Sequence, residues 1–360
     1  MSGYVEEERP QSSIRVLIVE DSMTVRQYLK HIIDVDERLQ VVATAGDGAE
    51  GVRLAGLKRP DIITMDIEMP RMDGFEAIRR IMADCPAPIV VVTSSWHPAD
   101  VETSFRAIEA GALTTLEKPP GPGHPRSETL AAKLVQALKT MSEVPVVRRR
   151  AVNHMPDKTH DRPPALGKTH KIDVVAVGAS TGGPPVIKTI LGGVDPSFSA
   201  PFLIVQHMSR GFIEGMAAWL DRCCRLSVRL AADGQRVENR TVYFAPDDRH
   251  MGIRSNGRIV LGNDPPEYGM RPAVAHLFRS VADAYGPCGA GILLSGMGRD
   301  GALELLRMKE AGALTMAQHK DSCAVYGMPA EAVNIGGADM VLSPGEMTDV
   351  LNTSVRRINA

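Results

Sequence analysis

Short apolar runs alternate with amphipathic stretches over most of the 360-residue chain. The runs are rich in β-branched residues and apolar on both faces, which is typical of buried parallel strands. In the stretches between them, apolar residues recur at the three- and four-residue spacing of one helix face. Strands and helices in strict alternation predict an α/β protein built on parallel sheets.

The first segment with this pattern lies between about Ile14 and Lys139 and predicts one small doubly wound sheet. We assign it to a domain of residues 14–142, preceded by an extension of residues 1–13. The expected strands are Ile14–Val19, Leu39–Thr44, Ile62–Met65, Ile89–Thr93 and Leu113–Leu116. The expected helices are Thr24–Ile33, Gly48–Leu57, Gly74–Met82, Val101–Glu109 and Ser127–Thr140.

Residues 143–171 break the pattern: Pro, Lys and Arg are frequent and apolar periodicity is lost, so we expect an extended linker. A second doubly wound α/β domain is expected at residues 172–360, with a helix at Pro184–Leu191. Within it, Ser255-Asn256-Gly257 is a hairpin turn signal. The expected strands are Asp173–Val177, Phe202–Gln206, Leu226–Leu230, Thr241–Ala245, Ala290–Ser295, Ala313–Ala317 and Met340–Leu342, with a hairpin of His250–Ile253 and Arg258–Leu261.

Composition narrows the class of protein. Hydrophobic residues make up 44% and charged residues 23%, which excludes a disordered, collagen-like or purely coiled-coil chain. Lys and Arg total 41 against 43 Asp and Glu, so no basic field is available for nucleic acid. The apolar runs are too short for a transmembrane helix, and five Cys without CxxC spacing predict neither disulfides nor a zinc site. We expect a cytoplasmic protein with no membrane insertion.

Polar residues follow the strands of the first domain at the edge where parallel sheets bind ligands. Glu20 and Asp21 follow the first strand, Asp66 the third, Thr93 ends the fourth and Lys118 follows the fifth. Carboxylates gathered without a cation would repel one another, so we expect Mg²⁺ among them. A carboxylate beside Mg²⁺, facing an ammonium and a hydroxyl, can accept a phosphoryl group. The alternative is that each acid only caps a helix or ends a strand.

The runs "LIVEDS", "MDIEMPRMDG", "VVVTSS" and "EKP" resemble the receiver domain of two-component response regulators, which has a flavodoxin-like fold. The resemblance implies that Asp66 is the phosphoacceptor and that Thr93 and Lys118 respond to the phosphoryl group. Two positions depart from the family pattern: Glu20 stands where Asp is commoner, and Thr115 stands where an aromatic switch residue is frequent. The implied Mg²⁺ ligands are Glu20, Asp21, Asp66 and the backbone carbonyl of Glu68.

A glycine-rich turn opens the second domain. Gly178-Ala179-Ser180-Thr181-Gly182 is a G-x-S-x-G sequence between a strand and a helix, which exposes a serine nucleophile on a sharp turn. Pro184 suits the first helical turn, and a helix N-terminus there would offer donors to an oxyanion. Two alternatives stay open at this point: a phosphate-binding loop and a plain strand-to-helix turn.

A serine hydroxyl needs a base, and His207 follows the next strand at the same sheet edge. Asp300, in a glycine-rich loop after another apolar strand, is a candidate acid to orient it. The same loop leaves the Met297 backbone N–H free to point at an oxyanion, with Thr181 as a second donor. The pattern also permits rivals, namely His250 as the base, or Asp247 or Asp248 paired with His276 or His319.

The motifs "GASTGG", "VQHM" and "LSGMGRDGA", behind a receiver domain and a linker, closely resemble the chemotaxis protein-glutamate methylesterases of the CheB family. The resemblance covers both domains. It implies a Rossmann-like methylesterase domain with Ser180, His207 and Asp300 as the catalytic triad.

By this resemblance the enzyme demethylates glutamate methyl esters on chemoreceptors and deamidates specific receptor glutamines, for sensory adaptation. The chemotaxis histidine kinase would be the phosphodonor. We expect the receiver to cover the active-site edge until Asp66 is phosphorylated. Two other functions stay open: a receiver joined to a nucleotide-binding module without catalytic activity, and an ordinary carboxylesterase with another His as base.

Overall fold

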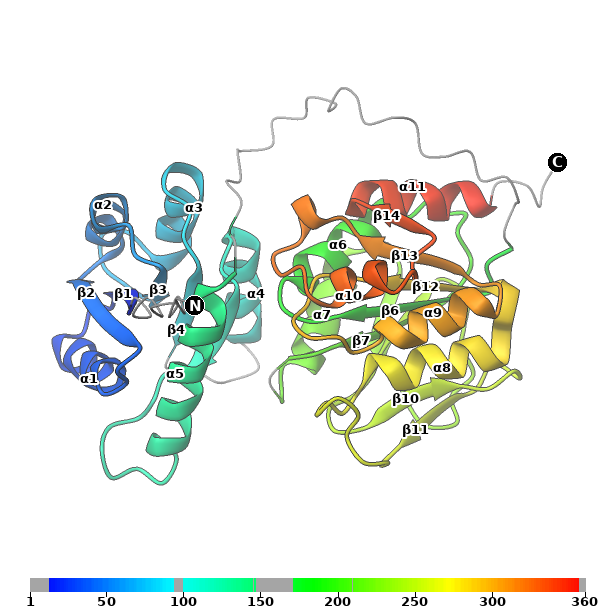
Figure 1. Ribbon diagram of the computed structural model, residues 1–360, viewed down its shortest axis with the longest axis horizontal. Helices are drawn as coiled ribbons and strands as arrows, with labels where there is room; N and C mark the ends of the chain where they lie inside the picture. The colour runs from blue at the N-terminus through cyan, green and yellow to red at the C-terminus, as the bar shows by residue number, and fades with distance from the viewer. Residues whose placement is uncertain (1–12, 94–99, 145, 147–170, 209, 356–360) are drawn as a thin grey trace, which may run out of the picture. The chain divides into compact units, whose positions relative to one another are not determined.

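A computed structural model describes residues 13–93, 100–144, 146, 171–208 and 210–355, and these fall into two compact units (Figure 1). Each unit is described by itself. Residues 1–12 and most of 143–171 lie outside the described part of the chain, and with them the expected extension and most of the expected linker. Among the helices in the described ranges, none combines the length and apolar composition that crossing a membrane requires.

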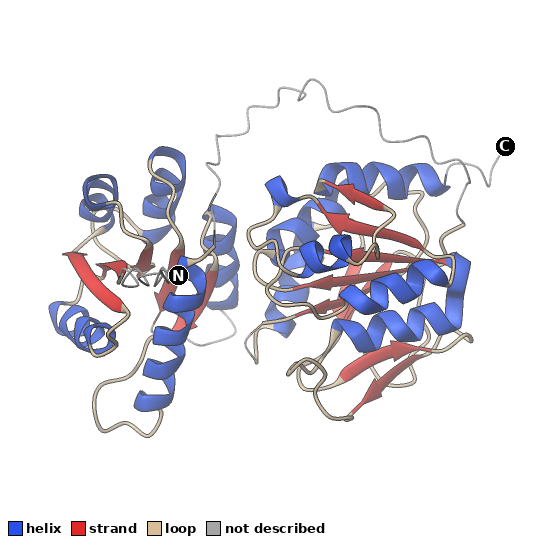
Figure 2. Ribbon diagram, in the orientation of Figure 1, coloured by secondary structure: helices blue, strands red, loops and turns tan. Residues whose placement is uncertain are grey.

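The first unit is built on a five-stranded parallel sheet with strand order β2-β1-β3-β4-β5, the flavodoxin-like order. Figure 2 shows the strands in red and the helices in blue. The strands of this sheet agree with the expected ones to within one residue at each end. They are β1 (Ile14–Val19), β2 (Leu39–Ala45), β3 (Ile62–Met65), β4 (Ile89–Thr93) and β5 (Thr114–Glu117). Along this part of the chain the helices are α1 (Met23–Asp34), α2 (Gly48–Lys58), α3 (Gly74–Asp84), α4 (Asp100–Ala110) and α5 (Ser127–Ser142), and α4 up to residue 108 is grouped with the second unit.

The second unit holds a seven-stranded parallel sheet with order β14-β13-β12-β6-β7-β9-β8, and a separate antiparallel hairpin of β10 with β11. The strands are β6 (Val174–Ala179), β7 (Phe202–Gln206), β8 (Ser227–Leu230), β9 (Thr241–Phe244), β10 (His250–Ile253), β11 (Ile259–Gly262), β12 (Gly289–Leu293), β13 (Leu314–Gln318) and β14 (Met340–Leu342). The helices are α6 (Gly183–Gly193), α7 (Ile213–Cys223), α8 (Val274–Tyr285), α9 (Ala302–Glu310), α10 (Met328–Asn334) and α11 (Pro344–Val355), with short 3₁₀ turns at Gly286–Cys288 and Lys320–Ser322.

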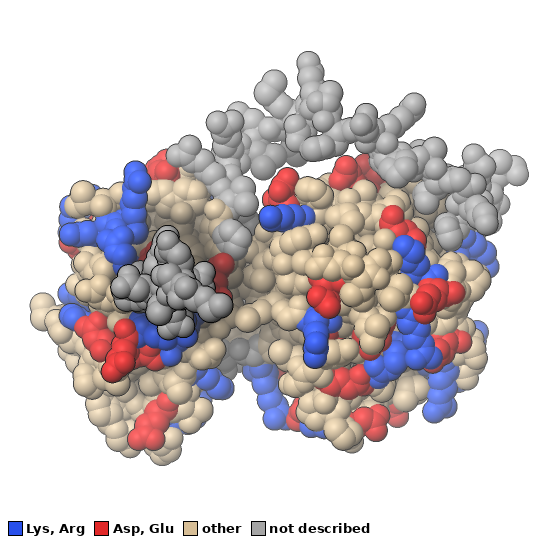
Figure 3. Space-filling view, in the orientation of Figure 1, with Lys and Arg blue, Asp and Glu red and all other residues tan. Residues whose placement is uncertain are grey.

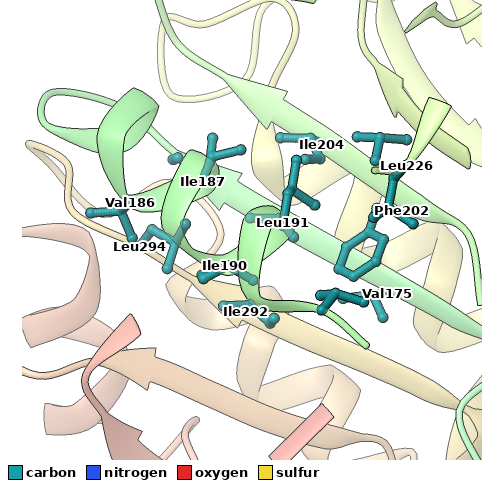
Figure 4. Close-up of a cluster of buried hydrophobic side chains, with 14 of the residues drawn as sticks. Val175, Val186, Ile187, Ile190, Leu191, Phe202, Ile204, Leu226, Ile292 and Leu294 are labelled. Atoms are coloured by element: carbon teal, nitrogen blue, oxygen red, sulfur yellow. The ribbon is translucent and has the colours of Figure 1, made fainter. Parts of the chain in front are cut away.

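Helices cover both faces of this sheet, and the central strand β6 shows why, because it carries apolar side chains on both of its faces. Val175 and Val177 belong to one core, with residues of α6, α7 and α11, whereas Val174 and Ala176 belong to the other, with residues of α8, α9 and α10. Alternate residues of a strand point to opposite faces, so a continuous apolar run buries both. Figure 4 shows Ile187, Ile190 and Leu191 of α6 against the first core. Burying each such side chain contributes about 1.5–3 kcal/mol.

The topology brings the candidate residues to one place. From β6 the chain turns through α6 to β7, whereas from β12 it turns through α9 to β13, on the opposite side of β6 in the sheet. Adjacent strands whose connections leave in opposite directions form a switch point, where ligands bind at the carboxyl ends of the strands. The β6–β12 boundary is such a point, and both glycine-rich loops begin there.

Candidate functional site

Three carboxylates and one ammonium meet at the carboxyl edge of the first sheet. One oxygen each of Glu20, Asp21 and Asp66 lies within 4.8 Å of the others. Lys118 Nζ lies 2.8 Å from Glu20 Oε2 and 2.9 Å from Asp66 Oδ2. The Lys118 backbone N–H donates to the Thr93 carbonyl at 2.8 Å, which ties the ends of β4 and β5 together. The structure thus brings these five residues to one edge of the sheet, in a cluster that we call the acidic pocket.

The negative charge of the acidic pocket is compensated only in part. Burial, as the largest influence, raises the pKa of Glu20, although Lys118 opposes it. For Lys118, burial lowers the pKa, but the hydrogen bonds and charges of Glu20 and Asp66 outweigh it and leave the pKa raised. One ammonium therefore faces three carboxylates.

The donor set fits a hard divalent cation. Mg²⁺ accepts a few carboxylates and keeps several waters, and here Glu20 and Asp66 are buried whereas Asp21 is exposed on the solvent side. Within the described ranges, the backbone carbonyl of Glu68, in the turn after β3, accepts no hydrogen bond from the protein. Asp66 Oδ1 accepts the Ile67 N–H at 2.8 Å, which fixes its carboxylate.

Ser180 is the first residue after β6. The strand begins one residue later and ends two residues later than expected, because Gly178 pairs with β12 and Ala179 with Gln206 of β7. The Ser180 N–H donates to the Ser295 carbonyl at 3.0 Å. A Cβ placed on Gly296 would lie 2.7 Å from Ser180 Cβ, so only glycine allows this loop to approach the serine so closely.

His207 and Asp300 form a close pair at the same edge. The His207 backbone N–H donates to the Ala179 carbonyl at 2.9 Å, which holds the His207 backbone beside the Ser180 turn. His207 Nε2 lies 3.0 Å from Asp300 Oδ2, with both side chains less than a tenth exposed. Within the described residues His207 Nε2 has no hydrogen-bond partner, so the pair is a close contact between an imidazole nitrogen and a carboxylate oxygen.

Asp300 is held by the start of α8. Its two oxygens accept the backbone N–H groups of Val274 and Ala275, each at 2.8 Å, so it caps a helix that begins 26 residues earlier. The positive end of the helix dipole stabilises negative charge at this position. Val274 fits between Gly178 and Gly301, where a Cβ on either would come within 2.3 Å of Val274 Cγ1.

The candidate oxyanion donors lie on the two loops at this edge. Within the described part of the chain, neither the Thr181 nor the Met297 backbone N–H makes a hydrogen bond to the protein. The start of α6 offers less than expected: Gly183 N–H donates to the Ser180 carbonyl, and Pro184 and Pro185 have no N–H. Pro184 does lie in the first helical turn, as the sequence predicts.

The rival residues have other partners. His250 is fully buried, with Nδ1 accepting the Ala273 N–H at 3.3 Å and Nε2 lying 3.1 Å from the Pro265 carbonyl. Its ring stacks on His276, which pairs with Glu267 at 3.3 Å. The ligand atoms of these three residues lie within 4.8 Å of one another, but both ring nitrogens of His250 are engaged, so no lone pair is directed at a metal.

The two rival aspartates are also engaged elsewhere. Asp247 accepts the Gly211 N–H at 2.6 Å. Asp248 pairs with Arg271 at 2.8 Å, and this hydrogen bond lowers its pKa. His319 Nδ1 accepts the backbone N–H of Asp321 at 3.3 Å. In the described ranges, the contacts recorded for Asp247 and Asp248 include neither His276 nor His319.

Fold and geometry together define a class: a receiver-type acidic pocket joined to an α/β unit that carries a serine, a histidine and an aspartate at a switch point. A family model for the CheB methylesterase matches residues 175–351, and one for the response regulator receiver domain matches residues 16–126. The chain is 47% identical to a protein-glutamate methylesterase/protein-glutamine glutaminase of Syntrophus aciditrophicus, over 94% of this chain and 97% of that one. It is 48% identical to one of Nitrosospira multiformis, over 91% and 93%.

Solved structures match each unit separately. The Thermotoga maritima CheB methylesterase catalytic domain is 34% identical, with a TM-score of 0.49, and the match covers 51% of this chain and 98% of that one. The response regulator domain of Thermotoga maritima CheB is 37% identical, with a TM-score of 0.34, and the match covers 37% and 98%. Because these relatives match over nearly the full length of both chains, the chain belongs to the CheB methylesterase family, with an N-terminal receiver domain.

Proposed function

We propose that this chain is a phosphorylation-activated protein-glutamate methylesterase and protein-glutamine glutaminase, with a receiver at residues 14–142 and a catalytic domain at 172–360. The relatives carry both activities in their names. The observation that carries the proposal is the His207–Asp300 pair, 3.0 Å apart, beside Ser180 at the switch point. The substrate is a γ-glutamyl methyl ester on the cytoplasmic helices of a chemoreceptor.

In the proposed reaction, Ser180 Oγ attacks the ester carbonyl while His207 takes its proton. His207 then protonates the leaving methoxide, methanol departs, and a water molecule activated by His207 hydrolyses the acyl-enzyme to glutamate. Asp300 orients the imidazole and stabilises its cationic form. The Met297 and Thr181 N–H groups would stabilise the oxyanion, each by about 2.7–4 kcal/mol when well aimed. With a glutamine substrate, ammonia leaves in place of methanol.

Methanol release from methylated receptor membranes tests this proposal. Ser180→Ala and His207→Ala should both abolish release, whereas His319→Ala should leave it unchanged. If methanol release persists in His207→Ala and is lost in His319→Ala, the result would favour an ordinary carboxylesterase with another base. Nucleotide binding without any methanol release would favour a binding module.

In the receiver, Asp66 accepts the phosphoryl group from the chemotaxis histidine kinase, and Thr93 and Lys118 contact the phosphoryl oxygens. Glu20, Asp21, Asp66 and the Glu68 carbonyl would hold Mg²⁺, which neutralises the charge that develops on those oxygens. Phosphorylation changes the esterase rate only through a free-energy difference between receiver states, and a tenfold change needs about 1.4 kcal/mol. Deleting residues 1–150 should raise the unphosphorylated rate, and an unchanged or lower rate from a folded fragment would contradict inhibition.

A further inference from the structure

One buried side chain connects the backbones of the proposed nucleophile and base. Gln206, the last residue of β7, is 5% exposed. Its Nε2 donates to the Ser180 carbonyl at 2.8 Å and to the His207 carbonyl at 2.9 Å. Among the described residues no other side chain is recorded bonding to both of these backbones.

We propose that Gln206 is a positioning residue, which holds the Ser180 turn and the His207 backbone at a fixed separation. The inference rests on the proposed function. The pairing of β6 with β7 ends at Ala179 and Gln206, and the bond from the His207 N–H to the Ala179 carbonyl is the last one between the two backbones, so no ladder hydrogen bond reaches the Ser180 or His207 carbonyl. The Gln206 amide supplies two bonds one residue further along, where the chemistry is placed.

The orientation of the amide follows from its partners. Both partners of Nε2 are carbonyl oxygens, which only accept, so a flipped amide would place Oε1 against two acceptors. In the observed orientation Oε1 is buried without a hydrogen-bond partner. It faces the start of α6, where a Cβ on Gly183 would lie 2.2 Å from Oε1 and where Pro184 and Pro185 have no N–H to offer.

This arrangement is costly for a residue with a purely structural role. A buried acceptor without a partner destabilises the fold, and such groups in native proteins call for an explanation. Leucine would occupy a similar volume at the end of an apolar strand without that cost. Control of the separation between Ser180 and His207 explains why a glutamine stands there, since misplacement by about 1 Å can lower a rate ~100-fold.

Gln206→Leu tests the inference in the full-length protein, against the matched variant Thr315→Val. Thr315 lies near the start of β13, away from the carboxyl edge of the sheet. It is fully buried, and its hydroxyl donates to Asp339 at 3.0 Å. Both variants remove buried hydrogen bonds at nearly constant shape and should lower Tm. In methanol release from methylated receptor membranes, Gln206→Leu should lower kcat ~10- to 100-fold with KM within about twofold, while Thr315→Val keeps kcat. Equal kcat values for the two variants would overturn the inference.

Gln206→Glu gives a second readout, which a lower stability alone would not produce. The introduced carboxyl can donate one hydrogen bond when protonated, but when ionised it repels both carbonyl oxygens. The ratio of its kcat to that of the wild type should therefore fall at least ~10-fold as pH rises from about 6 to about 9. A ratio that does not change with pH would contradict the positioning role of Gln206. This second test remains available if Gln206→Leu does not fold. Activity retained in Ser180→Ala would instead overturn the proposed function, whatever Gln206 does.

Discussion

The two sheet edges follow one architectural rule and treat charge in opposite ways. In the receiver pocket, Glu20, Asp21 and Asp66 share one ammonium, that of Lys118. At the edge that carries Ser180 and His207, the carboxylate of Asp300 accepts hydrogen bonds from two backbone N–H groups and lies against an imidazole. Both edges lie at the carboxyl ends of parallel strands, so the difference comes from the residues that end those strands.

In the proposed function, this difference corresponds to a switch at the first edge and a catalyst at the second. At the first edge one ammonium faces three carboxylates, so we expect the excess negative charge to attract a divalent cation, as the proposed phosphoryl transfer to Asp66 requires. At the second edge two backbone N–H groups of the protein compensate the charge of Asp300. The proposed function requires such groups to be held before substrate binds, because they would stabilise a transition state. On the face shown in Figure 3, Lys and Arg are interspersed with Asp and Glu, so the two local arrangements are not imposed by a charge field of one sign on that face.

The largest effect should come from Ser180→Ala. Loss of the nucleophile should lower kcat by ~10⁴-fold or more, since the residual rate comes only from binding and oxyanion stabilisation. Methanol release measures it. Phosphorylation of Asp66 by the kinase should be unaffected in this variant, and a loss of phosphorylation would show that the two edges cannot be altered independently.

Asp300→Asn should have the next largest effect. The amide cannot stabilise an imidazolium as the carboxylate does, so kcat should fall ~10²- to 10⁴-fold. Its side-chain oxygen can still accept one N–H at the start of α8, so the loss of stability should stay near 1 kcal/mol. Enzyme kinetics and thermal unfolding measure the two effects. A large loss of stability with little loss of kcat would show that Asp300 serves mainly as a cap.

Asp66→Asn should act only on the switch. It removes the phosphoacceptor and one of the clustered carboxylates, so activation by the phosphodonor should disappear and Mg²⁺ should bind more weakly, by about tenfold or more. The unphosphorylated esterase rate should not change. Esterase assays with and without phosphodonor, and titration with Mg²⁺, measure these outcomes. Activation that survives in Asp66→Asn would place the phosphorylation elsewhere.

The smallest effect concerns Glu267, which lies beside α8. A hydrogen bond from Arg279 lowers its pKa below the usual value of 4.5. A carboxyl with a lowered folded-state pKa stabilises the protein above its unfolded-state pKa, and this stability is lost as pH falls through the folded-state value. The free energy of unfolding should therefore fall less between pH 7 and pH 3 in Glu267→Gln, by about 1 kcal/mol or less. Urea unfolding of both proteins at both pH values measures this difference. An equal fall in the wild type and in Glu267→Gln would mean that the pair of Glu267 and Arg279 contributes nothing to stability.

Much of the fold is local and could be predicted from the sequence. The strands of the first sheet and the hairpin of β10 with β11 agree with the expected ranges because each β-branched run and turn residue specifies its own conformation. Where an expected boundary differs, as at the end of β6, the pairing with β7 and β12 lengthened the strand. A local pattern does not contain that information.

The sequence by itself determined the acidic cluster and the G-x-S-x-G turn, because each depends on which residue follows a recognisable strand. Only the tertiary structure decided which histidine meets which aspartate. His207, His250 and His319 are equivalent as a pattern, but the order of strands in the sheet brings only His207 to Asp300 among the described residues. The same holds for the cap that Asp300 provides to α8 and for the two bonds of Gln206. Contacts between distant segments depend on how helices and strands pack, and this packing is a property of the whole chain.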